Sequence, residues 1–192
     1  CNSSWFDFAN YPKFWYPDEG WQVISFIWES KFKGIFRCNS ILKYGRDIEM
    51  NQSLKSRYFA EVRTLRALYY YDLLHFYGRP PLIIEPTENA TETPPNATPE
   101  EIASFIKSEL LLAIPDLPIK YTGSDVGRVT KGTAVALLAK MYMQNHEWEL
   151  AKEQLKKIIE PGEVCDIYSL VTKWNDNFTS DNEQNSESIF EI

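Results

Sequence analysis

The stretch that decides the fold is AEVRTLRALYYYDLLHFYGRPPLII, residues 60–84. Its pattern predicts a helix from about Leu54 to Tyr77 with apolar side chains on opposite sides. One side carries Tyr58, Val62, Leu65, Tyr69 and Phe76, and the other carries Phe59, Ala67, Tyr70 and Leu74. A surface helix has a single apolar stripe, so we expect this helix to be packed from several directions. Gly78 can take the left-handed conformation that ends a helix, and the prolines that follow prevent its continuation.

Four further segments have the features of helices. Residues 20–45 carry apolar side chains at steps of three and four. Residues 98–114 open with Thr-Pro-Glu-Glu, which is the sequence of a capping box with proline in the first helical position. Residues 130–145 begin with a threonine N-cap, and residues 148–159 form a helix that a Pro-Gly pair ends.

The last two predicted helices have the spacing of a tetratricopeptide (TPR) pair. Ala151 takes the small position of the second helix and Leu155 a large apolar one, while Leu138, Ala139 and Tyr142 take the matching positions of the first. Because TPR units cannot bury both faces alone, we expect the first two helices to form another pair, with the third stacked between them. The sequence therefore predicts an all-α core of TPR-like antiparallel helix pairs in a right-handed stack, with irregular loops and a short terminal strand.

The chain divides into three parts. Residues 1–20 are predicted to be an aromatic-rich loop, residues 21–161 the helical core, and residues 162–192 an irregular tail. The tail ends in ESIFEI, whose alternation predicts a strand. A strand with nothing to pair against indicates an unfinished domain, so residues 1–192 are interpreted as a single truncated helical domain.

The central helix also resembles a family signature. The residues that carry the resemblance are Glu61, Arg66, Ala67, Tyr69, Tyr70, Tyr71, Leu73, Gly78 and Pro81, and they are similar to the signature of the SusD/RagB family. Four more blocks resemble that family in the same order, namely Trp28 to Leu42, Thr98 to Leu117 with its following proline, Gly127 to Ala151, and Glu187 to Ile192. The resemblance covers nearly the whole chain and departs from the family in a short N-terminus and a missing C-terminal half.

The resemblance implies a SusD-like (RagB-like) nutrient-binding lipoprotein of the Bacteroidota, anchored by lipid to the outer membrane on its extracellular face. Such a protein captures oligosaccharides for import through a partner TonB-dependent (SusC-like) outer-membrane transporter. Two alternatives stay open, a peptide-binding RagB-like member and a TPR-type protein-interaction scaffold. Cys1 is a candidate for the acylated residue of a lipoprotein, and the alternative is that the true N-terminus lies further upstream.

Composition argues against other partners. A formal charge of −7 disfavours nucleic acid, whose binding needs clustered Lys and Arg. The longest apolar runs, LLLAI at 110–114 and AVALLA at 134–139, are far shorter than the ~20 residues of a membrane span. Membrane association is therefore expected only through a lipid anchor. Cys38 lies inside a predicted helix and is expected to be a small buried hydrophobe.

The residues predict a binding protein without catalytic residues, cofactor or metal. His75, in the buried central helix, and His146, in a turn, lack a partner at the spacing that a nucleophilic triad requires. The acidic residues of the tail have no EF-hand spacing and are interpreted as solvated. Glu61 and Arg66 are interpreted as structural anchors, because buried charges persist only when they are paired. Asn39 is interpreted as a buried amide that ties neighbouring backbone.

The opening loop supplies the candidate ligand-binding residues. Trp5, Trp15 and Tyr16 lie outside any helical period, so no helical pattern predicts that they are buried in the core. Planar aromatic faces can stack on sugar rings while nearby polar groups bond to the hydroxyls. The alternative is that this loop plugs the end of the helical layer, because large aromatic residues are mostly buried.

Overall fold

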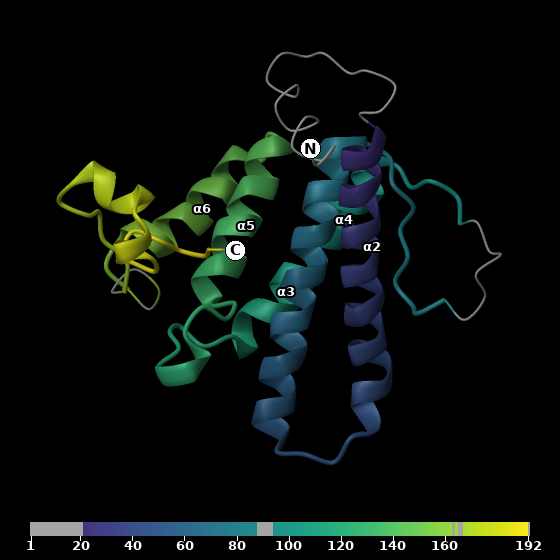
Figure 1. Cartoon of the computed structure of the whole chain (residues 1–192), viewed down its shortest axis with the longest axis horizontal. Coiled ribbons are helices and arrows are strands. Elements are labelled where there is room, and N and C mark those ends of the chain that lie inside the picture. The colour runs from purple at the N-terminus through teal and green to yellow at the C-terminus, as the bar shows by residue number, and fades with distance from the viewer. Residues whose placement is uncertain (1–20, 88–93, 163, 165–166, 192) are drawn as a thin grey trace, which may run out of the picture.

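The computed structural model describes residues 21–87, 94–162, 164 and 167–191, with side chains from Ile24 onward. Within these residues the chain forms five α-helices, labelled in Figure 1. They are α2 (Trp21–Tyr44), α3 (Gln52–Tyr77), α4 (Pro99–Ala113), α5 (Lys131–Gln144) and α6 (Trp148–Ile159). Short 3-10 turns follow α2 and α4 and recur before α5 and in the tail. Each α-helix corresponds to one that the sequence predicts.

The helices stack in the order of the sequence. α2 and α3 lie side by side as a long antiparallel pair, α4 packs against α3, and α5 lies between α4 and α6 (Figure 1). α3 contacts α2, α4 and α5, which confirms that the central helix is packed from several directions. α5 and α6 approach closely, and the small residues Ala139 and Ala151 are buried there. The predicted all-α core of TPR-like antiparallel pairs is confirmed.

The predicted terminal strand does not form in residues 187–191, where the described chain offers no extended neighbour. Phe190 instead packs against the core, and the Ile189 carbonyl accepts a hydrogen bond from Thr133 Oγ1 on α5 at 3.4 Å. Among the described residues, extended pairing is limited to an isolated bridge between Pro81 and Asn96. The apolar residues of this segment therefore dock the tail on α5, and the strand prediction is wrong.

Side-chain caps set the helix boundaries. Asn51 accepts a hydrogen bond from the Leu54 amide at 3.1 Å, so α3 begins before the predicted start at Leu54. Gly78 ends α3 with φ at 72°, in the left-handed region that favours glycine. Thr98 forms the predicted capping box with Glu101 at the start of α4.

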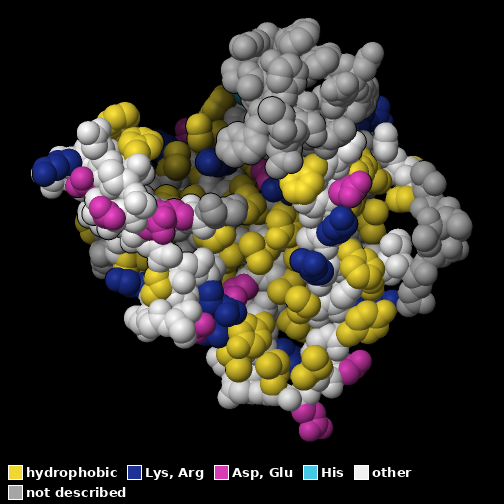
Figure 2. All heavy atoms as spheres, viewed as in Figure 1, with side chains coloured by type: hydrophobic (Ala, Val, Ile, Leu, Met, Phe, Trp, Pro, Cys, Tyr) yellow, Lys and Arg dark blue, Asp and Glu magenta, His cyan; other side chains and the backbone are white. Residues whose placement is uncertain are grey.

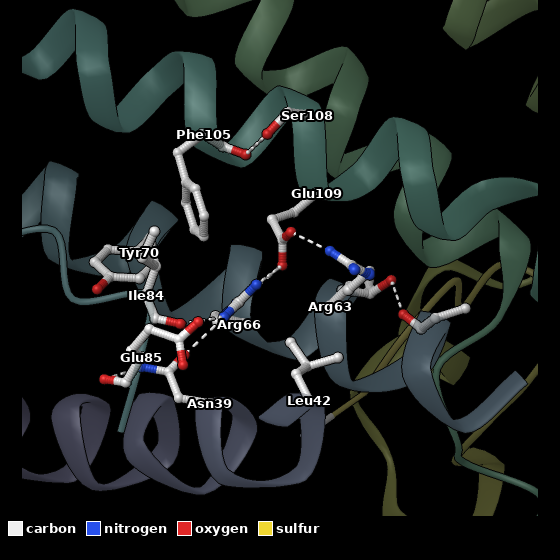
Figure 3. A network of polar contacts seen from close by, with 12 residues as sticks. Asn39, Leu42, Arg63, Arg66, Tyr70, Ile84, Glu85, Phe105, Ser108 and Glu109 are labelled. Carbon is white, nitrogen blue, oxygen red and sulfur yellow. Dashed lines mark hydrogen bonds and ion pairs between the residues drawn. The ribbon is translucent and has the colours of Figure 1, made fainter. Parts of the chain in front are cut away.

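Arg66 is a buried cation at the crossing of three helices (Figure 3). Its Nε and Nη2 donate to Glu109 Oε2 on α4 at 2.9 and 2.5 Å. Its Nη1 donates to Asn39 Oδ1 on α2 at 2.7 Å. Arg66 is 5% exposed and Glu109 only 3%, so their charges compensate each other inside the protein. The interpretation of Arg66 as a structural anchor is confirmed.

The segment after α3 is held by side chains of the two long helices. Asn39 Nδ2 donates to the carbonyl oxygens of Ile83 and Glu85 at 2.9 and 3.3 Å. The Tyr70 hydroxyl donates to the Ile83 carbonyl at 2.9 Å and accepts from the Ile83 amide at 2.7 Å. Burial raises the pKa of Tyr70 to about 12, so this hydroxyl keeps its proton. The prediction that Asn39 ties neighbouring backbone is confirmed.

Glu61 anchors the connection between α4 and α5. Its carboxylate accepts a hydrogen bond from the Tyr121 hydroxyl at 2.5 Å and from Arg128 Nη2 at 2.6 Å. Burial and the hydrogen bond to Glu61 both raise the pKa of Tyr121. Glu61 is therefore a structural anchor, as the sequence predicts.

Cys38 is a small buried hydrophobe, as predicted. Its side chain lies inside the protein on α2, and it is 5% exposed. Burial raises the pKa of its thiol to about 11, so the reactive thiolate is scarce at neutral pH.

The two apolar sides of α3 differ in burial, which gives a first test. Leu73, one turn after Tyr70, is fully buried, whereas Leu65, on the predicted stripe with Tyr69, is only half-buried. We expect Leu73→Ala to lower the free energy of unfolding by about 3–5 kcal/mol, because it leaves a cavity in the core. Leu65→Ala should cost clearly less in the same urea titration. Equal losses for the two variants would contradict this placement of α3.

Candidate functional site

The aromatic residues singled out in the sequence, Trp5, Trp15 and Tyr16, lie outside the described residues. The chain joins them directly to α2, which begins at Trp21. The described surface nearest to them along the chain is therefore the end of the α2–α3 pair where α2 begins and α3 stops.

Aromatic side chains from both helices gather at this end. The ring of Trp28 lies 4.7 Å from that of Phe32 and 4.9 Å from that of Tyr77, centroid to centroid. The second contact is edge to face, with the rings at 81°. Tyr77 donates a hydrogen bond from its hydroxyl to the Ile24 carbonyl at 2.5 Å, which ties α3 to α2. We call the group Phe26, Trp28, Phe32, Phe76 and Tyr77 the aromatic end.

Two rings of the aromatic end face solvent. Phe26 is 69% exposed and Phe76 is 62% exposed, whereas Trp28 is partly buried against the core. Phe76 lies beside Tyr77, with ring centroids 6.4 Å apart. Figure 2 shows hydrophobic side chains interspersed with basic and acidic ones over the α2–α3 pair. The aromatic end thus combines rings fixed by packing with rings that a ligand can reach.

Polar groups flank these rings. Lys31 and Asp72 form an ion pair at 2.5 Å between α2 and α3. Tyr71 stacks on His75 with ring centroids 4.1 Å apart, and Gln144 from α5 hydrogen-bonds to both. Burial, and then the charge of Asp72, raises the pKa of Tyr71, so its hydroxyl is neutral at physiological pH. These side chains offer both hydrogen-bond donors and acceptors beside the aromatic surface.

The two histidines make contacts within the protein. His75 is exposed, which corrects the expectation that it lies buried, because it sits near the end of α3. Its Nδ1 lies 2.6 Å from the Tyr71 carbonyl, and its Nε2 contacts Gln144. His146 occupies the predicted turn with φ at 59°, and its ring packs against Trp148.

Two other kinds of feature are absent from the part of the chain that the structure describes. No group of three or more His, Cys, Asp or Glu side chains could hold a metal ion there. No described helix is both long and apolar enough to cross a membrane.

A separate cavity of about 280 Å³ lies between the connection before α5 and the tail. Its lining mixes rings with polar groups, including Tyr121, Arg128, Tyr168, Gln184 and Ser188. Ligand pockets usually measure about 300–1,000 Å³, so this cavity suits one small ring at most.

Sequence comparison relates the chain to a known family. The profile of SusD-like proteins described as "starch-binding associating with outer membrane" matches residues 2–143. The chain belongs to this SusD-like family. The resemblance seen in the central helix and in the blocks around it is thereby confirmed.

Curated relatives cover most of the chain. A SusD-like protein of Formosa agariphila is 29% identical over 172 residues, which are 88% of this chain and 32% of that protein. The starch-binding protein SusD of Bacteroides thetaiotaomicron is 26% identical over 147 residues, which are 73% of this chain and 25% of that protein. This SusD-like chain therefore spans no more than about a third of the length of these relatives.

Solved structures share the helical fold. A laminarin-binding SusD-like protein superposes with a TM-score of 0.81 at 34% identity, covering 86% of this chain and 37% of that one. Surface glycan-binding protein A from Bacteroides uniformis superposes with a TM-score of 0.76 at 30% identity, with the same coverage of both chains. Glycan binding is thus the activity named for two structures that this chain resembles.

Sequence reasoning missed the aromatic end as a surface. It assigned Phe76 to a buried stripe because the residue lies at helical spacing from Tyr69. Its position could have indicated that Phe76 is exposed. The residue lies two positions before Gly78, in the last turn of a helix that its neighbours cover mainly along the middle. Phe26 lies in the second turn of α2, which is equally close to a helix end.

The exposed and the packed rings of the aromatic end should differ in how much they contribute to stability. We expect Phe26→Ala and Phe76→Ala to change the free energy of unfolding by no more than about 0.5 kcal/mol, because both rings face solvent. Trp28→Ala should cost about 2 kcal/mol or more, because its ring packs on Phe32 and Tyr77. Urea unfolding of the three variants measures this. A large loss in Phe76→Ala would mean that its ring belongs to the core.

Proposed function

We propose that this SusD-like chain is part of a cell-surface protein that binds oligosaccharides and passes them to a SusC-like TonB-dependent outer-membrane transporter for import. The observation that carries the proposal is the match to a laminarin-binding SusD-like protein at 34% identity and a TM-score of 0.81. The family description, starch-binding and associating with the outer membrane, supports the same ligand class and location.

The proposed contact surface combines two neighbouring parts of the chain. Trp15 and Tyr16 lie six and five residues before the start of α2 at Trp21, and Trp5 lies further upstream. The exposed rings of Phe26 and Phe76 lie at the end where α2 begins. Aromatic faces bury the C–H faces of sugar rings, and the flanking polar side chains can bond to hydroxyls. Such a surface is open, which suits a chain of several sugar units.

The protein is proposed to bind its ligand without cleaving it. Glycoside hydrolysis requires two carboxyl groups facing each other across the scissile bond at about 5–9.5 Å. At the aromatic end, Asp72 is engaged by Lys31 at 2.5 Å and forms a structural ion pair between α2 and α3. We therefore expect oligosaccharides to keep their chain length after incubation with the protein.

The location follows from the ligand and the partner. We propose that the protein sits on the extracellular face of the outer membrane, held by a lipid anchor and docked on its transporter. Oligosaccharides are too polar to cross a bilayer unaided, so capture outside the cell must be followed by passage through a channel.

Aromatic substitutions test the proposal. We expect Trp15→Ala or Trp5→Ala to weaken binding of laminarin oligosaccharides by about 1–3 kcal/mol in calorimetry, with Tyr16→Ala losing less, because hot-spot aromatics act locally. Melting temperatures should stay close to that of the wild type. Tyr44→Ala is the control, since this ring lies on the last residue of α2, at the opposite end of the helix from the aromatic end, and is 52% exposed.

Three outcomes would contradict the proposal. If Trp15→Ala unfolds the protein, the opening loop plugs the helical layer and does not contact the ligand. If the wild type binds peptides and no glycan, the protein is a peptide-binding member of its family. If oligosaccharides shorten during incubation, it is an enzyme.

A further inference from the structure

The tail exposes a pair of aromatic rings that contact each other at a tilt. Trp174 and Phe178 lie four residues apart on one short 3-10 helix, with ring centroids 4.7 Å apart and planes at 54°. Trp174 is 73% exposed and Phe178 is 69% exposed. Large aromatic side chains are usually well buried, so two adjacent rings held in solvent are unusual.

Hydrogen bonds within the tail fix the base of this pair. The Ser169 amide donates to the Ser186 carbonyl at 2.9 Å, and the Ser186 hydroxyl donates back to the Ser169 carbonyl at 3.0 Å. The Val171 amide donates to Glu187 at 3.0 Å, and Asn185 Nδ2 donates to Asn177 Oδ1 at 3.1 Å. Hydrogen bonds therefore join the segment before the rings to the segment after them.

The tail is also attached to the helical core. The Tyr168 and Thr130 hydroxyls lie 3.2 Å apart, and a side chain at Gly132 would collide with the Tyr168 ring. At the other end of the tail, Phe190 packs against the core. The loop between these two attachments is a platform on a fixed support, and it lies beside α6, apart from the α2–α3 pair (Figure 1).

The charge around the pair is mainly negative, which favours a neutral ligand over an anionic one. Residues 173–183 contain Asp176, Asp181 and Glu183 against a single Lys173. The carboxylates would repel an anionic chain, whereas a neutral sugar presents only hydroxyls and C–H faces. The exposed Asn175 lies next to Trp174 and offers an amide that can both donate and accept hydrogen bonds. Figure 2 shows hydrophobic side chains beside acidic ones on this lobe.

We propose that the Trp174–Phe178 pair is a second glycan-contacting platform, which stacks on the rings of a neutral oligosaccharide. The proposal rests on the glycan-binding function proposed above and adds a contact site far along the chain from the opening loop. Two separated platforms would let one long glycan, or two chains of a branched one, be held at once. Affinity gained in this way grows with the length of the ligand.

Matched tryptophan variants of the full chain test the platform. We expect Trp174→Ala to weaken binding of a long laminarin oligosaccharide by about tenfold in calorimetry, and Phe178→Ala by less. Trp148→Ala, another exposed tryptophan, should leave the affinity unchanged within about twofold. All three variants should keep the melting temperature of the wild type, because these rings face solvent. An alginate oligosaccharide, which is anionic, should bind at least about tenfold more weakly than the neutral one.

Each contrary result has a separate meaning. If the wild type binds no neutral glycan, the proposed function fails, and the platform fails with it. If the wild type binds but Trp174→Ala matches Trp148→Ala, only the platform is wrong. Equal binding of the alginate oligosaccharide would overturn the preference for a neutral ligand. A lowered melting temperature in Trp174→Ala would assign the ring to the core and overturn the platform.

Discussion

The buried guanidinium of Arg66 is the constraint on which the rest of the fold depends. A charge that is 5% exposed must be matched by an opposite charge and by hydrogen bonds, or its desolvation would cost several kcal/mol. Glu109 supplies the charge from α4, and Asn39 supplies an acceptor from α2. Satisfying one side chain therefore requires three helices to meet in one register, and Asn39 extends the network to the segment after α3 (Figure 3).

That register determines what the ends of the helices present. Because the crossing fixes α2 against α3, Trp28 meets Tyr77 and the rings of Phe26 and Phe76 remain outside. The aromatic end thus depends on a register that a polar contact elsewhere on the helices helps to fix. The tail has a similar arrangement on a smaller scale, because internal hydrogen bonds hold a loop whose rings face solvent. In both places a fixed support carries an exposed aromatic surface, which is what stacking on sugars requires.

Much of the fold could be predicted from the sequence, because helix length, caps and stops are local. The burial of Arg66 and Asn39 was also predictable, since polar residues within apolar stripes must be satisfied. Their partners were not, because Glu109 lies 43 residues from Arg66 and no local pattern joins them. Phe76 was misplaced because helical spacing says nothing about how far neighbours cover a helix end. The prediction of a terminal strand was wrong because an alternating pattern forms a strand only where another strand can pair with it.

A double-mutant cycle on Arg66 and Glu109 tests the central claim most directly. Glu109→Gln should lower the free energy of unfolding by about 3–5 kcal/mol, because it leaves the buried charge of Arg66 without its partner. Arg66→Met should cost less, because Glu109 keeps an ion pair with Arg63 at 2.5 Å. The double variant should lose clearly less than the sum, with a coupling of about 2–3 kcal/mol. The ion pair Lys156–Glu160 at 3.4 Å, whose side chains are 51% and 59% exposed, is the control and should couple by less than about 1 kcal/mol. Additive losses within about 0.5 kcal/mol for Arg66 and Glu109 would show that this contact does not organise the fold.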